Sequence, residues 1–212
     1  MQNERSFFDH VLSTTRSIRL RLDLEREVDS ATLSDCIRLA TYAPNASNAQ
    51  DWRWIIVDDP ETKHFIAERY RAGMMETMRR LLAERERSGD EAGARHSRAT
   101  IYLGEVLEQV PVHVIPCMRG RIEHDASLPS VTRLLGSIYP AVWSFQLALN
   151  SRGLGSTLTT SHLLAEPEVA ERLGVPSDYT QVALIPVAHI KGADLSPPPR
   201  RPVNEVISWN GW

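Results

Sequence analysis

The amino-acid sequence predicts helices packed around a small sheet, which is an α/β or α+β fold. Two observations predict the helices: apolar residues recur every three or four positions over residues 61–87, and residues 137–152 are strongly apolar. A third observation predicts the sheet, because short apolar runs occupy residues 54–57, 110–116 and 181–190. The chain has no internal repeat and no linker-like stretch, so we expect a single domain.

The first half of the chain predicts a helix, a strand and a long helix. Residues 30–43 place Leu33, Ile37 and Ala40 on one face, and this helix should end before Pro44 because proline disfavours helical backbone in the preceding residue. Residues 54–57 then form a short strand that is closed by a turn. The helix over residues 61–87 follows this turn.

The second half begins with an irregular segment. Residues 88–98 lose the helical periodicity and contain two glycines, so we expect a mobile loop there. Residues 110–116 are apolar nearly throughout, which is typical of a strand buried on both faces. We further expect the apolar helix to end at Gly153, a short helix over residues 168–173, and a last strand over residues 181–190.

Length, composition and charge exclude several classes of protein. With 212 residues, the chain is long enough to bury a core without disulfides or a structural metal. It has 24 Lys and Arg against 27 Asp and Glu, a net charge of −3, whereas nucleic-acid binders usually carry a basic excess. No apolar run is long enough for a bilayer, and the first residues lack a signal-peptide pattern. We therefore expect a cytoplasmic protein with neither nucleic acid nor membrane as partner.

Most sequence signatures of catalysis are absent. There is no P-loop and no GxSxG elbow, and the Gly-Leu-Gly at 153–155 follows a helix where a dinucleotide fingerprint would open one. The seven histidines show no metal-binding spacing, so we expect no metal site. His113 within an apolar strand and Cys117 at its end are interpreted as buried structural residues.

Four polar segments remain as candidates for a binding site, and two lie in the N-terminal quarter. In residues 15–19, Arg16 and Arg19 share one face of a helical turn with Ser17 between them, a pattern that can clamp a phosphate. A solvated basic stretch explains this pattern equally well. Residues 43–52 are rich in Asn and Gln, whose amides match the edge of a planar heterocycle. An Asn-rich turn is the alternative.

The other two candidate segments lie toward the C-terminus. Residues 153–161 combine two glycines, which let the backbone approach a flat ligand, with hydroxyls that can bond a ring nitrogen. An ordinary β-branched strand with turns fits this segment equally well. Arg200 and Arg201 follow three prolines, so they end a rigid arm. On their own they favour a surface charge pair.

Together, the four segments resemble the nitroreductase family of FMN-dependent oxidoreductases. Arg-Ser-Ile-Arg at 16–19 resembles the family's RSxR, and Ala-Pro-Asn-Ala-Ser-Asn-Ala-Gln-Asp-Trp at 43–52 resembles its APSxxNxQPW. Gly-Leu-Gly-Ser at 153–156 resembles GLGS, and Arg-Arg-Pro-Val-Asn-Glu-Val at 200–206 resembles the terminal RRPLEEV. The motifs occur in register and cover the chain except about 65–108, where the family itself varies.

The resemblance implies an α+β fold with a mostly antiparallel central sheet, formed by residues 1–212 as one FMN-binding domain. It also implies an interlocked homodimer with two FMN sites at the interface, where Pro44 and Asn45 reach the flavin of the other subunit. Arg16 and Arg200 would bind the FMN phosphate with help from Ser17, while Arg19 would stabilise the charge that develops on the flavin ring. The other implied cofactor-binding residues are Asn48, Gln50, Leu158, Thr159, Thr160 and Arg201. Because the flavin performs the chemistry, no catalytic side chain is expected.

The activity implied by the resemblance is ping-pong reduction of nitroaromatics, quinones or a related electron-poor metabolite, with NADPH or NADH as electron donor. The alternatives are a flavin-dependent metabolite oxidase or dehydrogenase, and a flavin-binding module without turnover. Thr159 and Thr160 also resemble the iodotyrosine deiodinase branch, a dehalogenase whose Glu–Tyr–Lys set has no convincing match in residues 68–98. Asn45 and Asp51 depart from the family pattern, but no departure removes a cation from the phosphate clamp.

Residues 65–108 are the predicted substrate lid. Between Arg71 and Arg98 the sequence has seven arginines against five acids. We expect this helix and loop to close over the flavin, with Tyr70, Met74 and Met78 forming an apolar wall. The alternative is that the methionines belong to the core and the arginines are simply solvated.

Overall fold

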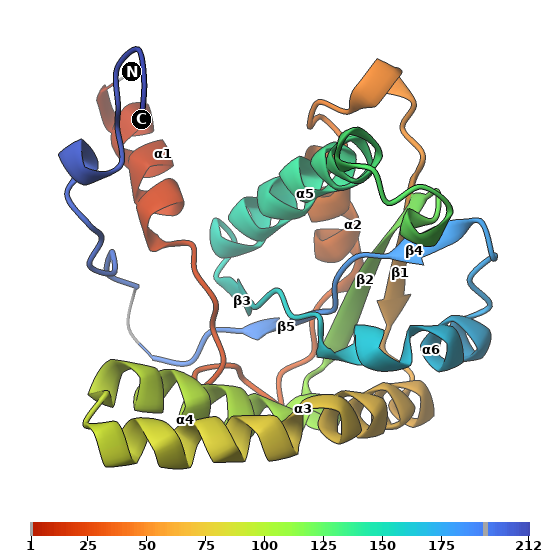
Figure 1. Ribbon diagram of the computed structural model, residues 1–212, viewed down its shortest axis with the longest axis horizontal. Helices are drawn as coiled ribbons and strands as arrows, with labels where there is room; N and C mark the ends of the chain where they lie inside the picture. The colour runs from red at the N-terminus through yellow and green to blue at the C-terminus, as the bar shows by residue number, and fades with distance from the viewer. Residues whose placement is uncertain (1, 193–194) are drawn as a thin grey trace.

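A five-stranded sheet lies between two groups of helices in the computed structural model, which describes residues 2–192 and 195–212 (Figure 1). The strand order is β1–β2–β5–β3, with β4 beside β2, and all of these strand pairs are antiparallel. This agrees with the mostly antiparallel sheet that the resemblance implied. The strands are β1 (Trp52–Val57), β2 (Val112–Arg119), β3 (Leu154–Ser156), β4 (Tyr179–Gln181) and β5 (Ile185–His189).

Each face of the sheet is covered by its own helices and its own core. One core joins α2 (Ser30–Ala40) and α5 (Leu128–Asn150) to the sheet through buried residues such as Leu33, Val114 and Phe145. The other core joins α3 (Pro60–Ser88), α4 (Glu91–Val106) and α6 (Glu166–Leu173) to the opposite face. Successive side chains of a strand point to opposite faces, so Val114 and Ile115 of β2 belong to different cores.

The segment predicted to be a mobile loop, residues 88–98, is a helical hairpin, so that prediction was wrong. Gly89 ends α3 in the left-handed region, with φ of 75°, and Asp90 caps α4 by accepting a hydrogen bond from the Gly93 amide at 2.9 Å. Arg85 then joins the two helices, because its guanidinium donates to Ser97 Oγ at 2.7 Å. The apolar periodicity is missing from residues 88–98 because hydrogen bonds, as well as apolar contacts, hold this end of α4.

Two further boundaries differ from the prediction. Helix α5 begins at Leu128, well before residue 137, because Pro129 lies in its first turn, where the missing amide costs nothing. The last predicted strand, residues 181–190, is divided into β4 and β5. The residues between them pair elsewhere, since Leu184 exchanges backbone hydrogen bonds with Thr159.

Helix α1 (Gln2–Thr14) and the C-terminal segment extend away from the sheet on the same side of the molecule (Figure 1). The end of α1 is fixed to α5, because Asn150 Nδ2 donates to the hydroxyls of Thr14 and Thr15 at 3.0 and 2.8 Å. Beyond this anchor both segments expose apolar side chains: Phe7, Phe8, Leu12, Val203, Val206, Ile207, Trp209 and Trp212. Within the described residues, no helix combines the length and the apolar character needed to cross a bilayer.

Candidate functional site

The Arg-Ser-Ile-Arg segment lies along the edge of the sheet beside β3. The Ile18 amide donates to the Ser156 carbonyl at 2.9 Å, and Ser17 forms a parallel bridge with Ser156. Helix α1 has already ended at Thr14, so the helical turn expected over residues 15–19 is wrong. The backbone here pairs with a strand, and this pairing fixes the segment against the Gly-Leu-Gly-Ser segment.

Gly155 makes this close pairing possible. A Cβ atom at position 155 would lie 2.9 Å from Ile190 Cγ1 and 3.1 Å from Ile18 Cγ2, which is closer than ordinary packing allows. The role of this glycine is therefore to let Ile18 pack directly on the strand, which sets the position of the two flanking arginines.

Arg16 and Arg19 are the two cations of this segment. Both side chains are half-buried, and among the described residues neither has a carboxylate within ion-pair distance. By contrast, the partly buried Arg121 is paired with Glu166 at 3.0 Å. Burial lowers the pKa of the Arg19 guanidinium, and Tyr70 opposes this shift. Partly buried cations without counter-charges provide a preorganised binding site for an anion.

Residues 157–160 carry hydroxyl groups next to these arginines. The backbone of Thr159 is fixed by two hydrogen bonds with Leu184, at 3.0 and 2.8 Å. Its side chain is half-buried, and Thr159 Oγ1 lies 3.2 Å from Tyr70 Oη. Leu158 is also half-buried, and Thr160 is exposed. The Arg16–Arg19 segment pairs with Ser156, three residues before Thr159, so these two candidate segments are adjacent.

The predicted lid residues belong largely to the core in this chain. Tyr70 and Met74 are 1% and 7% exposed and pack in the cluster beneath α3 and α4, while Met78 is half-buried at its edge. This matches the alternative in which the methionines are core residues. The contact of any of the three with a substrate stays a prediction.

The loop that contains Pro44, Asn45, Asn48 and Gln50 lies in a different place. Ala46 bonds to Ser137 in the first half of α5, at 3.1 Å, whereas Thr15 is bonded to Asn150 at the other end of that helix. Thirteen residues separate Ser137 from Asn150, which corresponds to about 20 Å along a helix that rises 1.5 Å per residue. Within one chain, the loop and the Arg16–Arg19 pair are therefore not brought together.

This loop is strained and mostly exposed. Ser47, Asn48 and Gln50 all have positive φ, at 55°, 51° and 53°, a region that non-glycine residues rarely adopt. Hydrogen bonds of side-chain amides stabilise this strained backbone. Asn45 Oδ1 accepts from the Gln50 backbone amide at 2.9 Å, and Gln50 Nε2 donates to Asn48 Oδ1 at 3.2 Å. Strain of this kind is typical of binding sites.

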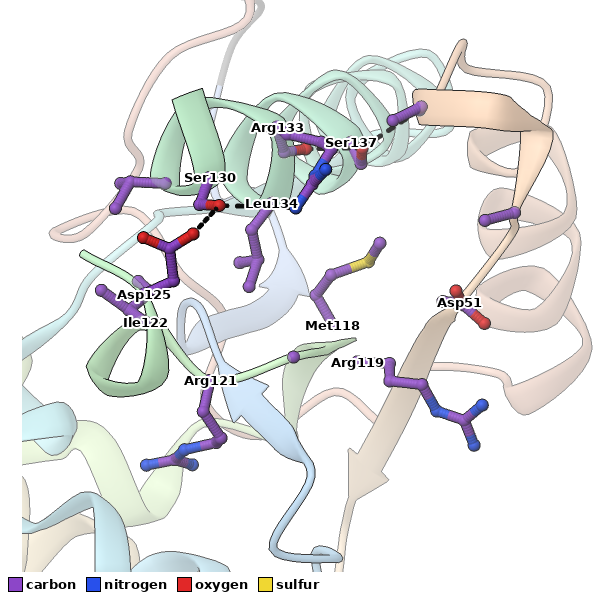
Figure 2. A pocket seen from close by; sticks show the side chains of 14 residues that line it. Asp51, Met118, Arg119, Arg121, Ile122, Asp125, Ser130, Arg133, Leu134 and Ser137 are labelled. Atoms are coloured by element: carbon purple, nitrogen blue, oxygen red, sulfur yellow. Dashed lines mark hydrogen bonds between the residues drawn. The ribbon is translucent and has the colours of Figure 1, made fainter. Parts of the chain in front are cut away.

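A cavity of about 260 Å³ lies between this loop, the end of β2 and the first turns of α5 (Figure 2). The apolar side chains of Met118 and Leu134 contribute to its wall, and Ser130, Arg133 and Ser137 of α5 lie along one side. The sequence motifs did not indicate these residues. The first turns of α5 lack a recognisable signal, so only the fold places them beside the loop.

The C-terminal arginines, Arg200 and Arg201, are exposed. Arg200 donates to the carbonyl of Pro199 at 3.2 Å. The phosphate clamp of Arg16 and Arg200 stays a prediction.

The family follows from comparison with known proteins. The model of the nitroreductase family matches residues 12–189, most of the chain, including the Arg16–Arg19 segment and β3. The chain belongs to the nitroreductase family. This confirms the resemblance inferred from the sequence motifs.

The relatives carry two kinds of name. The chain is 25% identical over 209 residues to a Bacillus subtilis protein named "putative NAD(P)H nitroreductase YdgI", covering 95% of this chain and 97% of YdgI. It is 28% identical over 174 residues to the iodotyrosine deiodinase of Thermotoga neapolitana, covering 81% of each chain. A solved iodotyrosine deiodinase structure, bound to FMN and 3-iodo-L-tyrosine, matches with a TM-score of 0.71 at 22% identity, covering 97% of this chain and 99% of that one.

Proposed function

We propose that this nitroreductase-family protein is an FMN-dependent oxidoreductase that accepts electrons from NADH or NADPH and reduces an electron-poor small molecule, such as a nitroaromatic or a quinone. The observation that carries the proposal is the half-buried pair of Arg16 and Arg19, which has no carboxylate within ion-pair distance among the described residues and lies on a segment paired with Ser156, just before residues 157–160. The related NAD(P)H nitroreductase and the FMN-bound structure of the same fold support this choice of cofactor and donor.

The residues of this neighbourhood suit FMN in charge and in shape. A flavin mononucleotide has a dianionic phosphate, for which guanidinium groups are strong hydrogen-bond donors. Its flat ring needs hydroxyl or amide partners at its edge, and Leu158, Thr159 and Thr160 offer an apolar side chain and two hydroxyls. Bound FMN would supply the electron-transfer chemistry, while these residues hold and orient it.

The proposed site is completed by a second copy of the chain. Within one chain, the loop at residues 44–50 bonds to the first half of α5 and the Arg16–Arg19 segment lies near its C-terminal end, so the two are about 20 Å apart along the helix. The exposed apolar residues of α1 and the C-terminal segment, such as Phe8 and Trp209, are the kind of surface that a subunit interface buries. We therefore propose a homodimer in which Pro44, Asn45, Asn48 and Gln50 serve the partner's flavin.

An anaerobic absorbance spectrum tests the central proposal. The purified protein, loaded with FMN, is recorded before and after addition of NADPH or NADH. Bleaching of the flavin band supports the reductase function and identifies the donor, and reoxidation by a nitroaromatic or a quinone completes the cycle. Protein that remains colourless after incubation with FMN would contradict the assignment of the Arg16–Arg19 site. A flavin that stays oxidised would favour a metabolite oxidase or a carrier.

Reductive deiodination is the second candidate function. Thr159 and the similarity to the deiodinase structure favour it. Against it, the chain has no lysine between Lys63 and Lys191, so the predicted lid cannot supply the Glu–Tyr–Lys set. Anaerobic release of iodide from 3-iodo-L-tyrosine by the reduced protein distinguishes this activity from nitro or quinone reduction.

A further inference from the structure

Tyr70 is placed at the junction between the α3–α4 hairpin and the candidate flavin site. Its side chain is 1% exposed, and its hydroxyl lies 3.2 Å from Thr159 Oγ1. This is the one hydrogen bond of the Tyr70 hydroxyl within the described residues. A buried tyrosine hydroxyl normally needs such a partner, so the Tyr70–Thr159 contact is a fixed part of the fold.

The backbone on both sides of this contact is held in place. Thr159 is bonded to Leu184 through both its amide and its carbonyl. On the other side, α4 packs against α3 at Gly104, where a Cβ atom would lie 2.7 Å from Met75 Sδ and 3.6 Å from Tyr70 Cε1. Helix α3 also packs on the turn after Thr160, because a Cβ at Gly73 would meet Leu164 Cδ1 at 2.8 Å. The two oxygens therefore meet at a rigid junction.

The chemistry of two bonded hydroxyls gives Thr159 two possible roles. Each hydroxyl has one proton and can also accept a hydrogen bond. When Tyr70 donates to Thr159, the threonine proton is free to be donated to a ligand acceptor. When Thr159 donates to Tyr70, the threonine oxygen is free to accept from a ligand donor. A ring nitrogen that is an acceptor when oxidised and an N–H donor when reduced, as flavin N5 is, would find a partner in both states.

We propose that Tyr70 is a positioning residue for the flavin site: its buried hydroxyl orients the Thr159 hydroxyl toward the ring and lets that hydroxyl either donate or accept. This inference rests on the proposed function. It gives the α3–α4 hairpin a role in setting the relative affinity of the site for oxidised and reduced FMN. Arg19 lies in the segment that pairs with Ser156, three residues before Thr159, so the cation predicted at the pyrimidine end is on an adjacent segment.

The test compares the affinities of the protein for oxidised and reduced FMN. In Tyr70→Phe only the hydroxyl is removed, and one hydrogen bond of ordinary strength corresponds to a change of up to about tenfold in the ratio of the two dissociation constants. A tenfold change equals about 30 mV in the midpoint potential of a two-electron couple. We expect Thr159→Val to cause a similar change, and the double variant to change the ratio no further than either single variant.

Tyr139→Phe is the matched control. Tyr139 donates its hydroxyl to the Val182 carbonyl at 3.0 Å, so this variant also loses a tyrosine hydrogen bond, but one that does not involve Thr159. We expect it to lower the thermal midpoint as Tyr70→Phe does and to leave the FMN affinity ratio unchanged.

Three results would overturn the proposal. An unchanged ratio in Tyr70→Phe together with a changed ratio in Thr159→Val would show that Tyr70 does not act on Thr159. Additive effects in the double variant would show that the two hydroxyls act independently. A wild-type protein that binds no FMN would contradict the proposed function, and therefore also the inference that rests on it.

Discussion

The two halves of the candidate site are built in opposite ways. The Arg16–Arg19 segment is paired to β3, half-buried and supported from below by Tyr70 and the second core. The loop at residues 44–50 is exposed, has three residues with positive φ, and is held mainly by its own amides. One half is therefore preorganised by the chain alone. The other half has few contacts to keep its shape and would gain them only from a ligand or a second subunit.

The largest expected effect comes from removing both cations of the preorganised half. In Arg16→Ala/Arg19→Ala, two charge-assisted hydrogen-bond donors are lost, each worth about 1.5–3 kcal/mol. We therefore expect the dissociation constant for FMN to rise by about 10²- to 10⁴-fold, measured by quenching of flavin fluorescence.

Arg26→Ala is the control for that variant, because Arg26 is an exposed arginine of the same basic stretch. It should leave FMN affinity within about twofold. Equal losses in the two variants would show that general basic charge, and not the half-buried pair, attracts the cofactor.

The second effect concerns stability in acid, because two histidines are buried in the fold whereas the loop at residues 44–50 contains none. His113 and His162 are fully buried, both nitrogens of His162 lack a partner in the described structure, and burial lowers the pKa of each histidine to about 4. The unfolded chain binds these protons near pH 6.5, so the free energy of unfolding should fall as the pH drops from 6.5 to 4. The expected loss is up to about 3 kcal/mol per histidine.

Urea denaturation at pH 7.5 and pH 5 measures this loss. His162→Leu should flatten the pH dependence, because one of the two buried imidazoles is gone. His124→Gln, at an exposed position, should follow the wild type. An unchanged pH dependence in His162→Leu would mean that His162 is not the group that titrates.

The third effect is the steric cost of an added methyl group, which should be large at a tightly packed glycine and small at a glycine with free space around it. Gly155→Ala places a methyl group against Ile18 and Ile190, and overpacking of this kind costs about 1–3 kcal/mol. We expect lower stability together with weaker FMN binding, since Ile18 lies between the two arginines. In Gly136→Ala the added methyl group meets nothing within 4 Å, and replacing a helical glycine should leave stability unchanged or raise it by up to about 1 kcal/mol.

The sequence singles out candidate site residues, but it does not show how they are assembled. Arg16, Arg19 and Thr159 are recognisable because each stands in a motif, and the strand pairing at Ser156 joins two of these motifs. The hairpin at residues 88–98 was missed because its signal is a left-handed glycine and an aspartate cap, not an apolar period. The role of Tyr70 could not be predicted either, because its contact with Thr159 spans 89 residues and depends on how α3 packs on the sheet edge.

The smallest expected effect belongs to the loop, and it depends on protein concentration. Asn45→Ala removes the acceptor of the Gln50 amide, so the loop loses one hydrogen bond that holds its strained backbone. If the loop serves the partner's flavin, we expect FMN affinity to fall by about five- to tenfold, the equivalent of one hydrogen bond. This fall should be present where the protein is dimeric and vanish on dilution below the dimer dissociation constant, because a monomer's flavin never meets the loop. Fluorescence titration at two protein concentrations measures the FMN affinity, and sedimentation equilibrium measures the dimer dissociation constant. A loss of affinity that persists in the monomer would mean that the loop acts on its own chain, and the contrast between the two halves would then lie in packing alone.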